Sequence, residues 1–142
     1  VVAMLLAKPF MGKLSDERGR IPFIVAGLLL GAVTITLIPW VDDILSLSLL
    51  SIGFGLTVAT VTASTSALVT EIAGTSAHGS SIGVLSSIMD VGHSTGPLIT
   101  GMVVGAISYT AGFGLAGGLL AMGAMLFVLG MRTGPWKERT TL

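Results

Sequence analysis

Cysteine is absent from this sequence of 142 residues, which excludes disulfide bonds within it and thiolate ligands for a metal ion. The two histidines are not accompanied by a second group of good metal ligands, so we expect no metal site. Charge is also scarce, because 10% of the residues are charged and 52% are hydrophobic. That composition leaves too little polar surface to cover a water-soluble globule. We therefore expect the lipid bilayer as a partner, with no cofactor and no nucleic acid.

Long stretches of the chain carry no charged side chain. With the histidines counted as neutral, none occurs in residues 21–41, 44–70 or 91–131. A bilayer core of about 30 Å takes about 20 helical residues to cross, so each stretch can hold at least one membrane-spanning helix. The expected fold class is all-α, a polytopic bundle of transmembrane helices. The predicted helices cover residues 21–40, 45–68, 80–107 and 112–131.

The segments outside these helices complete one predicted transmembrane domain over residues 1–142. Residues 1–11 rise only about 16 Å as a helix, so we expect them to be the end of a truncated helix that begins upstream. Residues 12–20 are a predicted loop, and residues 132–142 are a predicted tail.

All seven Lys and Arg residues fall on one side of the predicted membrane, within residues 8–20 and 132–139. Because Lys and Arg accumulate on the cytoplasmic side, we predict that the 12–20 loop and the C-terminal tail are cytoplasmic. The opposite side receives the short 41–44 link, which carries Asp42 and Asp43. The sequence thus predicts a multi-pass protein of the plasma or inner membrane.

Glycine is abundant, with 20 residues, and several glycines are spaced to lie on one helical face. Helices in lipid associate through small residues that let their backbones approach. We therefore predict a tightly packed bundle. The pairs with this spacing are Gly27 and Gly31, Gly92 and Gly96, Gly101 and Gly105, and Gly114 and Gly118.

The 12–20 loop contains a specific pattern of glycines and charged residues. It reads G-K-L-S-D-E-R-G-R, and it resembles the G-x-L-x-D-R-x-G-R loop of the major facilitator superfamily of transporters. In that family the loop joins the second and third helices of each six-helix half, and the resemblance implies charge contacts that stabilise one conformation. The matching residues are Gly12, Asp16, Arg18, Gly19 and Arg20.

Glu17 departs from the family pattern, which usually has a basic residue at this place. The resemblance therefore does not carry over any role that needs that cation. The loop also fits a simpler interpretation, a solvated turn that follows the preference of basic residues for the cytoplasm.

A spaced set of glycines precedes and follows Pro97 in the predicted 80–107 helix. It resembles the G-x8-G-x3-G-P-x2-G-G element in the fifth helix of antiporters of this superfamily, with Thr100 at one glycine position. Pro97 leaves one carbonyl without its helical donor, and the glycines let another helix pack against the resulting bend, which suits a gate. A packing kink without a role in transport is the alternative. The set comprises Gly83, Gly92, Gly96, Pro97 and Gly101.

The resemblance also indicates which part of such a transporter the chain represents. The N-terminal half of the family usually has an Arg in its fourth helix, whereas residues 44–70 contain none and are rich in hydroxyl groups. The chain is therefore similar to a partial C-terminal half, from the end of helix 8 through helices 9 to 12. This implies an N-terminal half of the same polypeptide as a partner. Glu71 and residues 78–97 are most similar to the drug:proton antiporter branch.

Asp90 is the one acidic residue inside a predicted membrane helix, about a third of the way in from the cytoplasm. A carboxylate is costly there and normally faces a cavity or a partner. Ser87 and Ser94 recur on the same helical face, with His93 beside it. We predict that Asp90 binds and releases a proton during transport, with His93 as relay or partner. The alternative is a structural Asp90 that caps or pairs with a neighbouring helix.

Hydroxyl side chains in the 45–68 helix are spaced to line one helical face. Thr57, Thr60 and Ser64, together with Ser87 and Ser94, are therefore candidates for lining a transport pathway. Ser and Thr side chains in lipid also donate hydrogen bonds to carbonyls of their own helix. These hydroxyls therefore also fit a role in helix packing, which is more frequent than pathway lining.

Two patterns typical of soluble enzymes also occur. Residues 79–83 match the G-x-S-x-G nucleophile pattern, and residues 112–117 match G-x-G-x-x-G. Both patterns need a preceding β-strand, and none is predicted here, so we do not expect an enzyme.

Together these features predict a secondary active transporter that works by alternating access and exports a small molecule in exchange for protons. A proton-coupled uptake symporter of a sugar or organic acid is one alternative. A membrane scaffold or sensor without transport activity is the other.

Overall fold

The computed structural model describes residues 19–133, apart from the side chains of Thr75, Ser76, His78, Arg132 and Thr133. The predicted truncated helix at 1–11, the loop residues Gly12, Asp16 and Arg18, and the tail residues 134–142 lie outside the described residues. Within the described range every regular element is a helix, which confirms the all-α fold class. These elements are α2 (Arg20–Leu37), the short 3-10 helix η1 (Ile38–Trp40), α3 (Ile44–Ala106) and α4 (Tyr109–Thr133).

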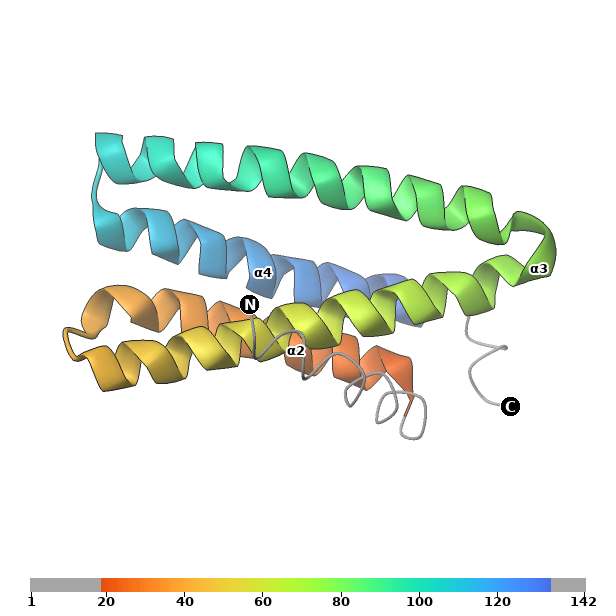
Figure 1. Cartoon of the computed structure of the whole chain (residues 1–142), viewed down its shortest axis with the longest axis horizontal. Coiled ribbons are helices and arrows are strands. Elements are labelled where there is room, and N and C mark those ends of the chain that lie inside the picture. The colour runs from red at the N-terminus through yellow and green to blue at the C-terminus, as the bar shows by residue number, and fades with distance from the viewer. Residues whose placement is uncertain (1–18, 134–142) are drawn as a thin grey trace.

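Helix α3 is two antiparallel helices joined at Gly74, as Figure 1 shows. Gly74 has a φ of 65° and a ψ of −175°, a conformation that only glycine adopts without strain. We call residues 44–73 the first arm of α3 and residues 75–106 its second arm. The sequence predicts a link over residues 69–79, between the membrane helices at 45–68 and 80–107. In the structure the chain direction instead reverses at Gly74 alone, because both helices continue beyond their apolar stretches.

Three segments are long and apolar enough to cross a membrane: Arg20–Trp40, Ile44–Gly74 and Tyr109–Met131. They coincide with three of the four predicted membrane helices. The second arm of α3 is not among them, although it is helical over a similar length. Asp90, His93 and many small polar residues lower its hydropathy, so its crossing of the membrane remains a prediction.

Helix α2 packs against both the first arm of α3 and α4, and small residues make these contacts possible. A Cβ added to Gly31 would lie 2.5 Å from Thr57 Cγ2, and one added to Gly27 would lie 2.8 Å from Val61 Cγ2. Both distances are too short for any residue larger than glycine. On the other side of α2, Gly117 of α4 packs against the Thr36 side chain. The predicted packing role of the Gly27 and Gly31 pair is confirmed.

The other three glycine pairs make no such contact in the described part of the chain. An added Cβ on any of these six glycines would have no neighbour within 4 Å. On α4 the glycine against α2 is Gly117, and its neighbour Gly118 points about 100° further round the helix. The Gly114 and Gly118 pair has no described neighbour, so its packing role stays a prediction, because spacing alone does not show which face meets another helix. The second-arm pairs, Gly92 with Gly96 and Gly101 with Gly105, likewise lie on surfaces without a described neighbour.

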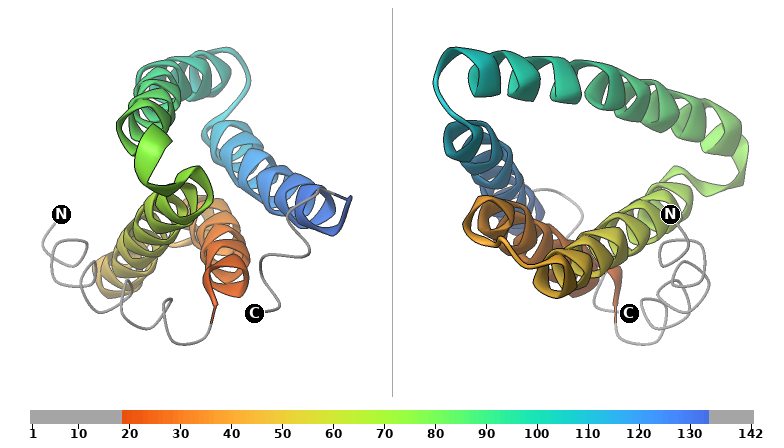
Figure 2. Two further views of the ribbon diagram at one scale, coloured as in Figure 1. Left: turned by 90° about the vertical axis from the view of Figure 1, so that its right-hand side faces the viewer. Right: turned by 60° about the vertical axis from the view of Figure 1, so that its left-hand side comes forward.

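The second arm is set apart from α2 and approaches α4 near the turn that joins them (Figure 2). At that turn Gly112 of α4 lies against Val104 and Thr100 of the arm. Towards the Gly74 end the arm exposes large apolar side chains, including Val84 and Ile88. It therefore has surfaces available to lipid or to further protein.

Candidate functional site

Asp90 lies at the middle of the second arm. It is 16 residues from Gly74 and 16 residues from Ala106, which bound the arm. At 1.5 Å per residue the carboxylate is therefore about 24 Å from either end. Measured along the helix, this is nearer the middle than the expected position about a third of the way into the predicted 80–107 helix, because the helix begins at residue 75 and not at residue 80.

Two serines flank Asp90 one turn away on the same face of the arm. Ser87 Oγ donates to the carbonyl oxygen of Gly83 at 3.0 Å, and Ser94 Oγ donates to the carbonyl oxygen of Asp90 at 2.9 Å. Both hydroxyls thus donate their hydrogen bond to a carbonyl oxygen of their own helix, as is common for Ser in apolar surroundings. All three side chains are exposed. The carboxylate of Asp90 makes no hydrogen bond or ion pair with the residues that the structure describes.

His93 follows Asp90 by three positions, so the two side chains are neighbours on the helix surface. Both are exposed, and no hydrogen bond joins them within residues 19–133. The structure therefore places the predicted proton-coupling residues beside each other without fixing a contact between them.

Pro97 lies inside the second arm, one turn beyond His93. Because proline has no N–H, the carbonyl oxygen of His93 has no helical donor. The only non-helical backbone within α3 is at Gly74, so the helix continues through Pro97. In a membrane the free carbonyl needs a donor from water or from another helix. The polar face of the arm thus combines a carboxylate, an imidazole and an unpaired carbonyl.

The glycines of the Gly-Pro element lie on the same arm and leave its surface open. An added Cβ on Gly83, Gly92, Gly96 or Gly101 would have no neighbour within 4 Å. Thr100, at one glycine position of the element, lies against Gly112 of α4, but none of the four glycines meets a described helix, so their predicted role in helix contact stays a prediction.

The hydroxyls of the first arm have a different setting, because they are buried in the core of the bundle. Thr57, Thr60 and Ser64 are 4%, 8% and 0% exposed. The methyl group of Thr57 lies against Gly31, and that of Thr60 lies near Gly27. Thr57 Oγ1 also donates to the carbonyl oxygen of Gly53 at 3.2 Å. These contacts favour helix packing over pathway lining for these three residues.

Thr34 of α2 belongs to the same buried set and was not among the predicted residues. Its hydroxyl donates to the carbonyl oxygens of Leu30 at 2.8 Å and of Gly31 at 3.1 Å, and its methyl group faces Gly53 across the helix contact. The sequence gives only a weak signal for this contact, because pairing Gly53 with Thr34 requires knowing that their two helices are neighbours.

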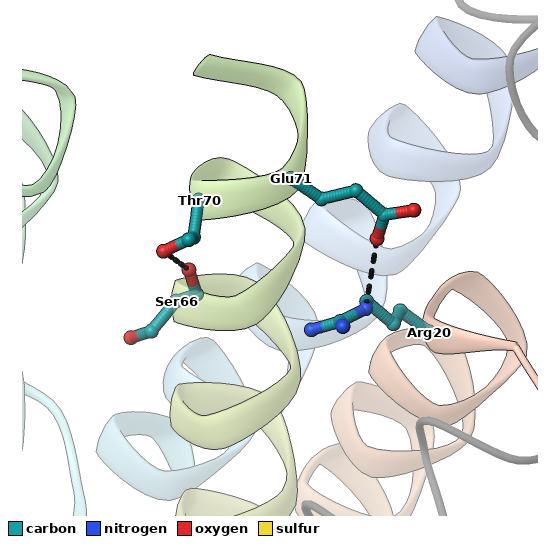
Figure 3. Close-up of polar contacts among 4 residues, drawn as sticks. All are labelled: Arg20, Ser66, Thr70 and Glu71. Atoms are coloured by element: carbon teal, nitrogen blue, oxygen red, sulfur yellow. Dashed lines mark hydrogen bonds and ion pairs between the residues drawn. The ribbon is translucent and has the colours of Figure 1, made fainter. Parts of the chain in front are cut away.

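Two residues of the predicted motif loop are described, and both lie where α2 begins. Gly19 precedes the helix with a φ of 90°, a value that favours glycine. Arg20 is the first helical residue, and its Nε lies 2.9 Å from Oε2 of Glu71 near the end of the first arm (Figure 3). The hydroxyl of Thr70, next to Glu71, instead donates to the carbonyl oxygen of Ser66 at 2.9 Å.

The ion pair gives Glu71 a partner that was not predicted from the sequence. It is 61% exposed, so it is both solvated and paired. The pair joins two helices at the end of the bundle that also contains the Gly74 turn, whereas the link between η1 and α3 lies at the opposite end (Figure 1). In residues 19–133 no three His, Asp or Glu side chains are grouped as a metal site would require.

A comparison with protein families gives a match over nearly the whole chain. The sequence profile of the Major Facilitator Superfamily matches residues 1–141. Comparisons with curated proteins and with solved structures give no match. The family consists of secondary transporters, and the apolar helices agree with a multi-pass membrane protein. The chain therefore belongs to the Major Facilitator Superfamily.

Proposed function

We propose that the protein is a proton-coupled exporter of a small amphiphilic molecule, similar to the drug:proton antiporters, and that this chain forms part of its C-terminal half. The observation that carries the proposal is the position of Asp90, at mid-length of a helix whose surrounding face is polar and built from small residues. The cytoplasmic membrane of the cell is the proposed location, with the Arg20 end of the bundle facing the cytoplasm.

The second arm has two kinds of surface, and only one of them suits lipid. Val84, Ile88 and Val91 are 59%, 65% and 63% exposed and share an apolar face. Asp90 lies about 100° further round the helix from Val91, because successive residues are rotated by that angle. An ionised carboxylate in hydrocarbon costs several kcal/mol or more, so the Asp90 face must meet water or protein. We assign the apolar face to lipid and the Asp90 face to the transport pathway.

A carboxylate at this depth can couple proton movement to substrate movement. In alternating access the site opens first to one side of the membrane and then to the other. Asp90 would take up a proton on one side and release it on the other. His93, three residues away, is positioned to pass the proton to and from the carboxylate.

The Arg20–Glu71 ion pair fits a role in setting the inward or outward preference of the transporter. It joins the residue that ends the motif loop to the last turn of the first arm. Opening of this end of the bundle would separate or rearrange the two helices and break the pair. The gain from an ion pair this exposed is small, about 0–1 kcal/mol, which suits a contact that must break in every cycle.

The test is substrate-dependent proton flux in proteoliposomes that contain the purified full-length protein. With a pH-sensitive dye inside, we expect Asp90→Asn to abolish the flux and Asp90→Glu to retain part of it. Asp42→Asn is the matched control, because Asp42 is an exposed acid outside the membrane helices. Substrate-driven flux through the Asp90→Asn variant at the wild-type level would refute the proton role. The direction of flux distinguishes export from uptake, and no flux with any solute would favour a scaffold or sensor.

A further inference from the structure

Trp40 and Tyr109 each combine an aromatic ring with a polar atom, and they lie at one end of the bundle. Trp40 ends η1 and Tyr109 begins α4, and in the described part of the chain they are the only Trp and Tyr. Figure 1 shows η1 and the start of α4 at the same end of the bundle, opposite the Gly74 turn. Gly117, two turns into α4, lies against Thr36, one turn before Trp40. The two aromatic residues are therefore at nearly the same level of the bundle.

Both rings are exposed. Trp40 is 74% exposed and Tyr109 is 53% exposed. The Tyr109 ring packs against Phe113 with 4.6 Å between the ring centroids, a contact that involves the ring and not the hydroxyl. No hydrogen bond to the indole N–H or to the phenol hydroxyl is formed among the described residues. Trp and Tyr side chains usually bury the ring and give the polar atom a partner. The partner of this end must therefore supply apolar surface and hydrogen-bond acceptors together.

The residues next to the two rings change from charged to apolar within one position. Asp42 and Asp43 are exposed in the link before α3, and Ile44 and Leu45 at the start of α3 are 80% and 73% exposed. Ile107, just before α4, is 73% exposed. Acidic groups favour water, whereas exposed apolar side chains of this size favour hydrocarbon. This end of the bundle therefore fits the boundary between water and hydrocarbon.

The opposite ends of α2 and α4 have arginine, and the separation matches the thickness of a bilayer. Arg20 is 20 residues from Trp40, about 30 Å, and Arg132 is 23 residues from Tyr109, about 34 Å. The hydrocarbon core of a bilayer is about 30 Å thick. The two helices are antiparallel, so both aromatic residues are at one end and both arginines at the other. Two neighbouring helices thus mark the same two boundaries.

We infer that Trp40 and Tyr109 lie in the headgroup layer of one lipid leaflet and fix the depth of this end of the bundle in the membrane. An indole or phenol ring at this level packs among the upper acyl chains, and its N–H or O–H donates to phosphate or ester oxygens of the lipid. Lipid is the partner and not another protein, because the apolar segments Arg20–Trp40 and Tyr109–Met131 lead directly from these residues across the membrane. The inference does not use the proposed transport activity.

The test measures the depth of Trp40 by fluorescence quenching in phosphatidylcholine vesicles. The full-length protein keeps Trp40 as its single tryptophan, with Trp136 and all others replaced by Phe. It is reconstituted with lipids that carry bromine either near the headgroup or near the end of the acyl chains. We expect stronger quenching by the shallow bromine.

Leu29→Trp in the Trp40→Phe background is the matched control. Leu29 is exposed near the middle of α2, about 16 Å from Trp40 along the helix. Its ratio of shallow to deep quenching should be at least about twofold lower than that of Trp40.

A second measurement asks whether the two rings fix the depth. A cysteine in place of Ile44, which is 80% exposed, reports the boundary by its rate of reaction with a water-soluble maleimide. Trp40→Leu with Tyr109→Leu removes the hydrogen-bond donors and should let this end move into hydrocarbon, which slows labelling at least about twofold. Trp40→Tyr with Tyr109→Trp keeps a polar ring at both positions and should leave the rate unchanged.

Stronger quenching of Trp40 by the deep bromine, or quenching by aqueous acrylamide without any by brominated lipid, would overturn the inference. An unchanged labelling rate in the double leucine variant would overturn it too. If that variant does not fold, the quenching of Trp40 decides, because it needs no change at this end of the bundle. Both measurements are independent of Asp90 and of proton flux, so failure of the proposed function leaves them unaffected.

Discussion

Arg20 and Glu71, which are 51 positions apart in the sequence, form an ion pair between two helices, with 2.9 Å between Arg20 Nε and Glu71 Oε2. The pair joins the start of α2 to the end of the first arm of α3. Arg20 is the last residue of the motif loop, so the contact links that loop to the part of the chain that precedes the Gly74 turn.

We predict that breaking this ion pair has a small effect on stability. Arg20→Gln or Glu71→Gln should each lower the free energy of unfolding by about 1 kcal/mol or less, because Glu71 is 61% exposed and water screens the interaction. The charge swap Arg20→Glu with Glu71→Arg should recover part of the loss. Unfolding of the purified protein in detergent, at low and high salt, measures each effect. The stability loss of the swapped variant is compared with the sum of the losses in Arg20→Glu and in Glu71→Arg alone. If the two values are equal, the two side chains do not interact.

The contact between Gly31 and Thr57 predicts a larger effect. Gly31→Ala places a methyl group 2.5 Å from Thr57 Cγ2, so α2 and the first arm must move apart. The expected loss is about 1–3 kcal/mol in the free energy of unfolding. Gly118→Ala is the matched control, because its added Cβ has no neighbour within 4 Å, and it should change stability by less than about 0.5 kcal/mol. Equal losses in the two variants would contradict the packing of these helices.

The reversal at Gly74 predicts an effect that comes from the backbone alone. Gly74→Ala meets no neighbour within 4 Å, yet it should destabilise the protein by about 1–3 kcal/mol because the required φ of 65° and ψ of −175° are strained for alanine. Gly79→Ala, which is also open but lies within the helix, should be neutral or stabilising. A neutral Gly74→Ala would mean that the first and second arms continue as one helix.

Membrane topology provides a further prediction, since the chain contains no cysteine of its own. Asp42, in the link before α3, and Ala77, just after the Gly74 turn, are both exposed and flank opposite ends of the first arm, so each can be replaced by a single cysteine. In intact cells of a cysteine-free background, a membrane-impermeant maleimide should label Asp42→Cys, whereas Ala77→Cys should require permeabilisation. Labelling of both positions from outside would contradict the proposed orientation.

Much of the fold followed from the distribution of charge, because uncharged stretches of this length have few alternatives to membrane helices. The charge pattern could not show where helices end. The polar residues after Glu71 suggested a loop, but the backbone hydrogen bonds of a helix are satisfied there equally well, and only Gly74 is non-helical. Helix limits predicted from hydropathy therefore describe the apolar part of a helix and not its full length.

The contacts between helices were harder to predict than the helices themselves. Small-residue spacing identified Gly27 and Gly31 but could not distinguish them from Gly114 and Gly118, which face away from the described neighbours. The partner of Arg20 depends on which helix ends meet, and this is a property of the three-dimensional arrangement. Asp90 was found because a single acid in an apolar segment is conspicuous without any knowledge of contacts.

The central claim is that the Asp90 face of the second arm borders water while the Val91 face borders lipid. The test introduces single cysteines at residues 84–101 of a cysteine-free full-length protein in membranes. The rate at which each cysteine reacts with a small water-soluble thiol reagent is then measured. We predict fast labelling at His93, Pro97 and Gly101 and little at Val84, Ile88 and Val91, a pattern that repeats every three to four residues. Uniform labelling, or labelling confined to the apolar positions, would contradict the claim.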